Sequence, residues 1–300
     1  LDTVAPRRCT PDTIYGYRSL MRNHVYPVIG SVRMDALRAD HLDSVYARMQ
    51  EKGLAQGTQL LVHRILTRAL EVAFRRGICP LNPAKQVDAP SGKTPPIEPL
   101  TEAEAVGVLE AARRRRNAAR WSVGLGLGMR QGEALGLRWP FVDLDAGVLR
   151  VWWQLKRRAH VHGCGDQPCG RKRAGSCPSR VLPMRPGDIS LGGGLILKEP
   201  KGTGRREIPL PPELVAELRA HREIQMFERM MAPGAYADHD LVFAGLRGEP
   251  ITPEGDRKEW KTLLQIAQID DARLHDGRHT AATLLLALGV DIRVVQEILG

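Results

Sequence analysis

Hydrophobic residues recur at three- and four-residue spacing over residues 10–81, a pattern that predicts a series of amphipathic helices. Turn residues interrupt this pattern at Pro27, Gly30, Gly53 and Gly57. The clearest helix is expected over residues 58–74, where one apolar stripe is formed by Leu61, Ile65, Leu66, Ala69, Leu70 and Ala73. The N-terminal part of the chain is therefore expected to be a helical bundle.

A proline-dense stretch separates this helical region from the rest of the chain. Six prolines lie at positions 80, 83, 90, 95, 96 and 99, too many for a helix or a central strand. Thr101 and Glu104 then form a capping-box pattern that predicts the start of a new helix. With 300 residues available, we expect two domains, residues 1–92 and 100–300, joined by a linker at residues 93–99.

Three short segments rich in β-forming residues follow, at residues 148–153, 194–198 and 206–210. They predict a small antiparallel sheet, after which helical spacing resumes at Pro212. Residues 160–193 are rich in Gly, Arg, Pro and Cys without apolar periodicity, so we expect an insertion that interrupts the sheet. The predicted fold class is mainly α with a small antiparallel β-sheet.

The charge balance favours a polyanionic partner. Lys and Arg total 44 against 34 Asp and Glu, a formal net charge of +10, so nucleic acid is the first candidate, although solvated basic faces are common in other proteins. No run of 18 apolar residues occurs, and the first residues have no apolar signal core. We therefore expect a cytoplasmic protein without a membrane span.

Three of the five cysteines are close together in the expected insertion. A disulfide framework is not expected in a cytosolic protein of this size. The four ligands of a tetrahedral zinc site could come from Cys164, Cys169, Cys177 and either His160 or His162. The spacing is looser than a Cys-x-x-Cys pair, so a structural zinc ion and unligated thiols both stay open. In either case the DNA backbone could be contacted by Arg171, Lys172, Arg173 and Arg180.

Two arginine-centred segments carry the candidate chemistry. GLGLGMRQGEALGLRW surrounds Arg130, and LHDGRHTAATLLLALG contains His275 and Arg278. The first resembles the first arginine box of the tyrosine recombinase, or phage integrase, family, with Met129 in place of the usual Leu. The second is similar to the His-x-x-Arg-His-Thr box of the same family. In PKGTGRREIPLP, Lys201 matches the hairpin lysine that precedes an Ile-Pro-Leu strand in these recombinases.

The resemblance covers nearly the whole chain, since Arg22, Val25, Pro27 and Gly30 match a pattern of the family's helical domain. It implies a helical SAM-like core-binding domain followed by an α+β catalytic domain. It also implies site-specific recombination or integration: cleavage and rejoining of a DNA phosphodiester through a phosphotyrosyl intermediate. Double-stranded DNA would be the partner, the enzyme would act as a tetramer on synapsed sites, and catalysis would need no cofactor.

The residue types suit this reaction. Cleaving a phosphodiester without a metal requires positive donors on the phosphate oxygens, and the planar forks of Arg130 and Arg278 supply paired N–H groups. His275 lies three residues before Arg278, so on a helix both would reach one phosphate. Taken alone, each arginine could equally form a surface salt bridge. The order of the three boxes separates the two interpretations.

Two further residues support the predicted site. Lys201 would donate a proton to the departing deoxyribose oxygen, with Lys198 as the competing candidate. Glu133 would orient Arg130 or another site residue, although a capping or surface role fits it nearly as well.

The expected nucleophile is a tyrosine downstream of the second box. All five tyrosines precede His275, and Tyr236 falls in an expected loop. We therefore expect the nucleophile to lie beyond the given residues, the catalytic domain to be incomplete, and residues 1–300 alone to be inactive. Two alternatives stay open: a non-catalytic DNA-binding relative that occupies recombination sites, and an enzyme similar to type IB topoisomerases.

Overall fold

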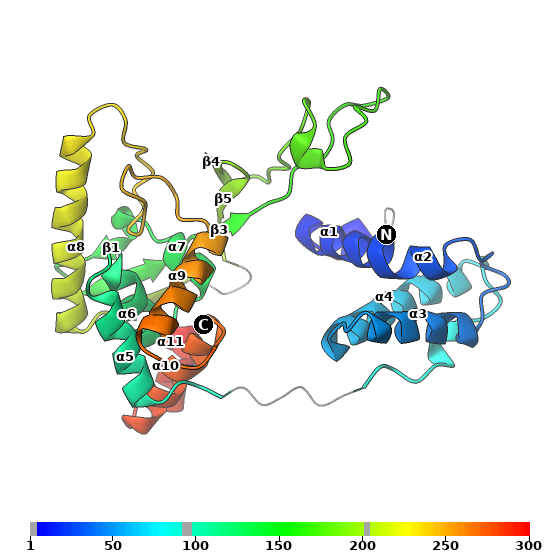
Figure 1. Ribbon diagram of the computed structural model, residues 1–300, viewed down its shortest axis with the longest axis horizontal. Coiled ribbons are helices and arrows are strands. Elements are labelled where there is room, and N and C mark those ends of the chain that lie inside the picture. Colours follow the sequence, from blue (N-terminus) through cyan, green and yellow to red (C-terminus); the bar gives the residue numbers. More distant parts are fainter. Residues whose placement is uncertain (1–4, 92–97, 201–204) are drawn as a thin grey trace. The chain divides into compact units, whose positions relative to one another are not determined.

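The computed structural model describes residues 5–91, 98–200 and 205–300, which belong to two compact units, Leu1–Pro96 and Ile97–Gly300 (Figure 1). Most of the linker predicted at residues 93–99 lies outside the described residues, so its structure stays a prediction. The N-terminal unit consists of helices η1 (Ala5–Arg7), α1 (Pro11–Leu20), η2 (Met21–Val25), α2 (Tyr26–Ile29), α3 (Ala39–Glu51), α4 (Gln56–Arg75) and η3 (Pro83–Lys85).

Helix α4 is the helix predicted over residues 58–74, and its buried face differs slightly from the prediction. Leu61 and Ala69 lie on the exposed side, and Val62 takes a place in the core instead. This core also contains Leu42 and Val45 of α3. The first part of the proline-dense stretch belongs to this unit, since it forms η3. The side chain of Asn82 caps this short helix by accepting a hydrogen bond from the Ala84 N–H at 3.1 Å.

The C-terminal unit contains seven α-helices and six strands among the residues that the structure describes. Its helices are α5 (Glu102–Ala112), α6 (Ala118–Gly126), α7 (Gln131–Leu135), α8 (Pro212–Met231), α9 (Pro253–Ile266), α10 (Asp276–Ala287) and α11 (Ile292–Leu299), with short 3-10 turns η4 (Trp139–Phe141) and η5 (Ala174–Ser176). Its strands are β1 (Val142–Asp143), β2 (Val148–Val151), β3 (Gln154–Arg157), β4 (Ile189–Gly192), β5 (Leu195–Lys198) and β6 (Arg206–Pro209). The predicted fold class, mainly α with antiparallel β-structure, is confirmed.

The strands form two sheets, whereas the sequence predicted one. In the first, β2 pairs antiparallel with β1 and β6, and in the second β5 pairs antiparallel with β3 and β4. The chain passes from one sheet to the other between Val151 and Gln154. The expected insertion at residues 160–193 is also not wholly irregular, because its last residues form β4 beside the buried strand β5.

The β3–β5–β4 sheet packs directly against α7, and glycine makes this close approach possible. A Cβ atom at Gly136 would lie 2.5 Å from the backbone nitrogen of Leu155 on β3, and one at Gly132 would lie 2.9 Å from the Leu155 carbonyl oxygen. Only a residue without a side chain fits this contact. Since Arg130 immediately precedes α7, the sheet helps to fix where Arg130 lies.

Two hydrophobic clusters surround α6 and support the helices that carry the second box. One joins α6 and α8 to the β1–β2–β6 sheet, and the other contains Trp121 and Trp260. Helix α10 packs on α6, and its Thr280 hydroxyl accepts a hydrogen bond from the Leu100 N–H at 2.9 Å.

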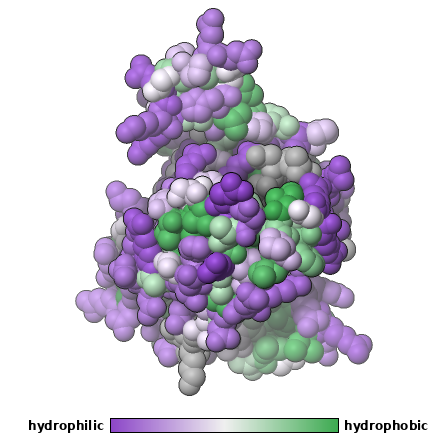
Figure 2. All heavy atoms as spheres, turned by 90° about the vertical axis from the view of Figure 1, so that its right-hand side faces the viewer, coloured by the Kyte–Doolittle hydropathy of each residue, from purple (hydrophilic) through white to green (hydrophobic). Residues whose placement is uncertain are grey.

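Hydrophilic side chains cover most of the face in Figure 2. Among the described helices, none combines the length and the apolar character that crossing a membrane requires.

Candidate active site

Arg130 occupies the N-cap position of α7. Its backbone N–H donates to Glu133 Oε2 at 3.1 Å, and its Nη1 donates to Glu133 Oε1 at 2.8 Å. The Arg130 side chain is 44% exposed, whereas that of Glu133 is 4% exposed. A buried carboxylate therefore holds an arginine whose fork is open to solvent.

Glu133 binds a second guanidinium, that of Arg206 at the start of β6. Arg206 Nη2 donates to Glu133 Oε2 at 2.8 Å, and its Nε donates to the Ile298 carbonyl oxygen at 2.6 Å. Burial acts to raise the pKa of Glu133, but hydrogen bonds and charge from Arg206 and Arg130 outweigh it and lower the pKa below its usual value. The ionised carboxylate can therefore align both arginines.

Arg206 was missed as a candidate site residue at the sequence level. It appeared there only within the segment PKGTGRREIPLP, with no role assigned to it. The sequence did give one signal, which is the place of Arg206 at the start of the predicted strand. A residue at a strand end can direct a long side chain toward a neighbouring helix, here α7. Its ion pair with Glu133 spans 73 positions of sequence, which no local pattern encodes.

Arg278 comes from α10 and meets Arg130 at one backbone oxygen. Arg278 Nη2 donates to the Gly300 carbonyl oxygen at 3.0 Å, and Arg130 Nη2 donates to the same oxygen at 2.7 Å. Arg278 Nη1 donates to the Gly128 carbonyl oxygen at 2.9 Å. The fold thus brings the two arginine boxes together, although they are 148 positions apart in the sequence (278 minus 130).

The electrostatic surroundings of Arg278 leave it charged. Burial and the nearby Arg130 lower its pKa to about 10. A group with this pKa is almost fully protonated at neutral pH. Gly128 adopts a φ of +59°, and a Cβ there would lie 2.4 Å from a methyl carbon of Leu299, so the turn before Arg130 requires glycine.

His275 lies beside both arginines. It is the N-cap residue of α10, so it directly precedes the helix rather than sharing it with Arg278 as the sequence predicted. Its side chain, Arg130 and Arg278 line one pocket of about 310 Å³. Desolvation of the ring, His279 and Arg278 lower the pKa of His275, so the neutral imidazole predominates at pH 7.

None of the described residues that line this pocket is a lysine. Lys201 lies outside the described residues, so its role stays a prediction, and its competitor Lys198 is buried on β5. Tyr236 lies in the loop between α8 and α9 and is the one tyrosine of the C-terminal unit. Among the described residues that line the pocket, none is a tyrosine.

Arg120, which lines this pocket, forms a buried ion pair with Asp256. Arg120 Nη2 donates to Asp256 Oδ2 at 3.0 Å, and both side chains are 2% exposed. Gln131, the residue after Arg130, donates to the same carboxylate oxygen at 3.0 Å. The guanidinium of Arg120 also lies 4.8 Å from the ring centre of Trp121. This pair ties α6 and α9 to the start of α7.

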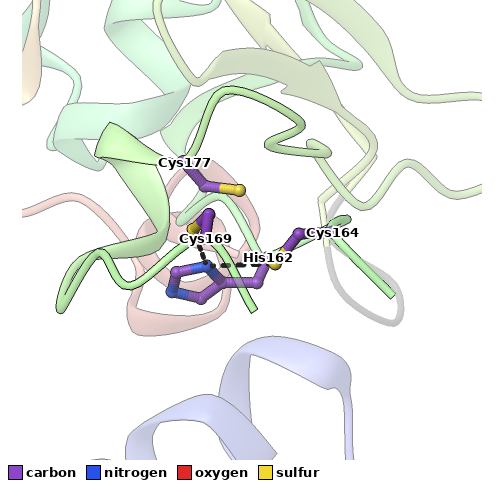
Figure 3. A group of neighbouring side chains, drawn as sticks. All are labelled: His162, Cys164, Cys169 and Cys177. Carbon is purple, nitrogen blue, oxygen red and sulfur yellow. Dashed lines mark hydrogen bonds between the residues drawn. The ribbon is translucent and has the colours of Figure 1, made fainter. Parts of the chain in front are cut away.

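The insertion contains a second cluster of chemically active side chains. His162, Cys164, Cys169 and Cys177 point toward one another, and their ligand atoms all lie within 4.8 Å of one another (Figure 3). His162, rather than His160, therefore accompanies the three cysteines. Burial acts to raise the pKa of Cys177, but contacts with Cys169 and His162 outweigh it and bring the pKa to about 7.

Comparisons with known proteins show what this chain is similar to. The model of the phage integrase family matches residues 178–300. An integrase of Saccharopolyspora erythraea is 35% identical over all of this chain and 74% of its own length. A XerC-like tyrosine recombinase of Caldanaerobacter subterraneus subsp. tengcongensis is 25% identical over 97% of this chain and 71% of its own length.

Solved structures share the fold at low sequence identity. The Tn1549 transposon integrase, in complex with a circular intermediate DNA, superposes with a TM-score of 0.73 at 20% identity, covering 99% of this chain and 88% of that one. A lambda integrase dimer bound to a core site gives a TM-score of 0.65 at 14% identity, covering 100% of this chain and 88% of that one. The fold of both units is therefore known from DNA-bound proteins.

Proposed function

The chain belongs to the phage integrase family of tyrosine recombinases, and we propose that it cleaves and rejoins specific sites in double-stranded DNA through a phosphotyrosyl intermediate. The family acts by DNA breaking and rejoining and needs no cofactor for catalysis. The observation that carries the proposal is that Arg130, His275 and Arg278 line one pocket, in which Arg278 Nη1 donates to the carbonyl oxygen of Gly128, two residues before Arg130, at 2.9 Å. Two guanidiniums that line one pocket can bind the oxygens of one phosphate together.

In this proposal Arg130 and Arg278 bind the non-bridging oxygens and stabilise the charge that develops on them. Each guanidinium has five N–H donors, and the backbone and Glu133 contacts use only part of them. Glu133 is a positioning residue, because its buried carboxylate fixes Arg130. Arg206 is held by the same carboxylate and adds positive charge behind the pocket.

Proton transfer is proposed for His275 and for a lysine. A neutral His275 can accept a proton from a nucleophile and return it during rejoining. Lys201, with Lys198 as the alternative, would protonate the departing deoxyribose oxygen, which is a poor leaving group as an alkoxide. The nucleophile is proposed to be a tyrosine C-terminal to Gly300, since the five tyrosines present all precede His275.

The partner in this proposal is a double-stranded attachment site. We expect four copies to assemble on two synapsed sites, as recombinases of this kind do, and the reaction to take place in the cytoplasm. The net charge of +10 is consistent with a substrate whose affinity comes largely from phosphate contacts.

The test is the formation of a covalent complex on a nicked suicide substrate that carries the site. The chain of residues 1–300 is expected to bind this DNA without forming a denaturant-resistant complex, because Arg130, His275 and Arg278 polarise a phosphate but form no stable ester. A chain extended through the downstream codons is expected to form the complex and to lose it when the added tyrosine is changed to Phe.

The outcomes separate the alternatives. A complex formed by residues 1–300 and abolished by Tyr236→Phe would place the nucleophile in the loop after α8. Binding without a complex in the extended chain would favour the non-catalytic DNA-binding relative. Relaxation of supercoiled DNA without site preference would favour an enzyme similar to type IB topoisomerases.

We also propose that the insertion holds one structural zinc ion through His162, Cys164, Cys169 and Cys177. A tetrahedral zinc site with ordinary Zn–S and Zn–N lengths has ligand-to-ligand distances of about 3.5–3.8 Å. Here His162 Nδ1 lies 3.5 Å from Cys169 Sγ and 3.9 Å from Cys164 Sγ. Two of the six donor pairs therefore already have nearly the separation that the metal requires, and all four donor atoms lie within 4.8 Å of one another.

Metal analysis of the purified chain is expected to find about one zinc per chain. Cys169→Ser is expected to lose most of it, whereas the matched change Cys9→Ser, outside the cluster, is expected to retain it. Cobalt(II) added to the metal-free chain should give the visible absorption of tetrahedral thiolate coordination. A folded wild-type chain that binds neither metal would contradict the site.

A further inference from the structure

We propose that the insertion, residues 160–193, makes a second contact with DNA. In this contact the phosphate backbone of the duplex is bound by Arg171, Lys172, Arg173 and Arg180. This inference rests on the proposed function, because it assumes that DNA is bound by the same unit. It adds a contact outside the pocket of Arg130 and Arg278 and gives the cysteine cluster a purpose.

The first observation is unbalanced charge. Residues 160–193 contain five Lys and Arg residues against two acidic residues, and one of these two, Asp188, is paired with the buried Arg158. Arg171, Lys172, Arg173 and Arg180 are exposed, and no ion pair joins them to any residue in the described part of the chain. Exposed arginines elsewhere in this unit are often paired, as Arg219 is with Asp145. The insertion therefore presents positive charge that nothing in the described chain neutralises.

The second observation is that the insertion is built to hold these cations in place. At its base, Arg158 donates to the Pro183 carbonyl oxygen at 2.6 Å, and Val161 and Val181 exchange two backbone hydrogen bonds of 2.9 and 3.0 Å. Farther along, the three consecutive cations lie between the ligands Cys169 and Cys177. A metal that joins these ligands closes the loop and lowers the entropy that the cations would lose on binding.

The third observation is where the insertion begins. It leaves the C-terminal unit after β3 and returns through β4, in the sheet that packs on α7 (Figure 1). Arg130 lies directly before α7. A duplex whose phosphate is bound by Arg130 therefore runs past the part of the unit from which the insertion extends, and B-DNA offers a phosphate charge about every 1.7 Å of its axis.

The side chains of the insertion favour duplex backbone over other ligands. Residues 160–193 contain no Phe, Trp or Tyr, so they offer no aromatic platform for stacking unpaired bases. Of their exposed charged side chains, four are cations and one, Asp166, is acidic, and such cations contact phosphates without reading sequence. We therefore expect the contact to be independent of base sequence.

The test compares the salt dependence of binding to a mixed-sequence duplex for the zinc-loaded wild-type chain and for Arg171→Gln/Lys172→Gln/Arg173→Gln. Three lost phosphate contacts should make the slope of log K against log salt shallower by about 2–3. Affinity near 0.1 M salt should fall by about 10-fold or more. The matched control is Arg113→Gln/Arg114→Gln/Arg247→Gln, which removes the same charge from other exposed positions and should change the slope by less than about 1.

Removal of the metal provides an independent readout. The metal-free wild-type chain is expected to lose affinity by about the same factor as the triple variant, and the triple variant is expected to lose no more when its metal is removed. Equal slopes for the triple variant and the control would overturn the inference while leaving the proposed function intact. A wild-type chain that binds no duplex at all would overturn both.

Discussion

Arg278→Lys is expected to slow DNA cleavage by about 10²–10³-fold while leaving DNA affinity nearly unchanged. Lysine keeps the positive charge, and affinity for DNA comes from many phosphate contacts, so binding is preserved. Cleavage is not preserved, because one ammonium cannot replace a fork that donates to the carbonyl oxygens of Gly128 and Gly300 and also faces the phosphate. Arg130→Lys is expected to behave in the same way, since it loses the Nη1 contact with Glu133.

The measurement is the initial rate of covalent complex formation by a chain extended to include its tyrosine, alongside the dissociation constant for the same DNA. Arg219→Lys is the matched control. Arg219 forms an exposed ion pair with Asp145, and the change is expected to leave both quantities as they are. Cleavage by Arg278→Lys at the wild-type rate would remove this arginine from the phosphate site.

Local patterns predicted the helices well because their causes are local. The capping box at the start of α5 is formed as expected, with the Thr101 N–H donating to Glu104 Oε2 at 2.7 Å. Helix α4 spans Gln56–Arg75, within two residues of its predicted bounds, although the exposure of Leu61 shows that the exact buried stripe depends on the neighbouring α3. The spacing of hydrophobic residues indicates that a helix has an apolar face, whereas packing against neighbouring helices determines which residues at the border of that face are buried.

Pairing between distant segments could not be predicted in this way. The pattern of β-forming residues identified β2, β5 and β6 but not their distribution over two sheets. Which strands pair depends on how distant segments pack, and a local pattern does not contain that information. The ion pairs of Glu133 with Arg206 and of Arg120 with Asp256 join residues 73 and 136 positions apart. The sequence could suggest Arg130, His275 and Arg278 only through a resemblance, and the structure adds the carboxylates that hold the arginines in place.

The largest expected effect on stability is that of Asp256→Ala, about 3–5 kcal/mol of unfolding free energy. The change removes the carboxylate that faces Arg120 Nε and Nη2 at 3.2 and 3.0 Å, and leaves a guanidinium that is 2% exposed without its counter-ion. A buried uncompensated charge costs far more than a lost surface contact, since water cannot reach it. Urea unfolding followed by tryptophan fluorescence reports this unit alone, because all five tryptophans lie in it.

Glu259→Ala on the same helix α9 is the matched control, because its partner Arg115 is exposed, and the expected cost is at most about 1 kcal/mol. Replacing both buried partners, as Arg120→Met/Asp256→Leu, is expected to recover much of the stability lost in the single variant, since no buried charge is left. A loss for Asp256→Ala no larger than that for Glu259→Ala would contradict the argument.

The variant Asp256→Ala should also loosen the start of α7, because Gln131, the residue after Arg130, donates to Asp256. At a temperature where the chain stays folded, the rate of DNA cleavage is therefore expected to fall more than the affinity for DNA does.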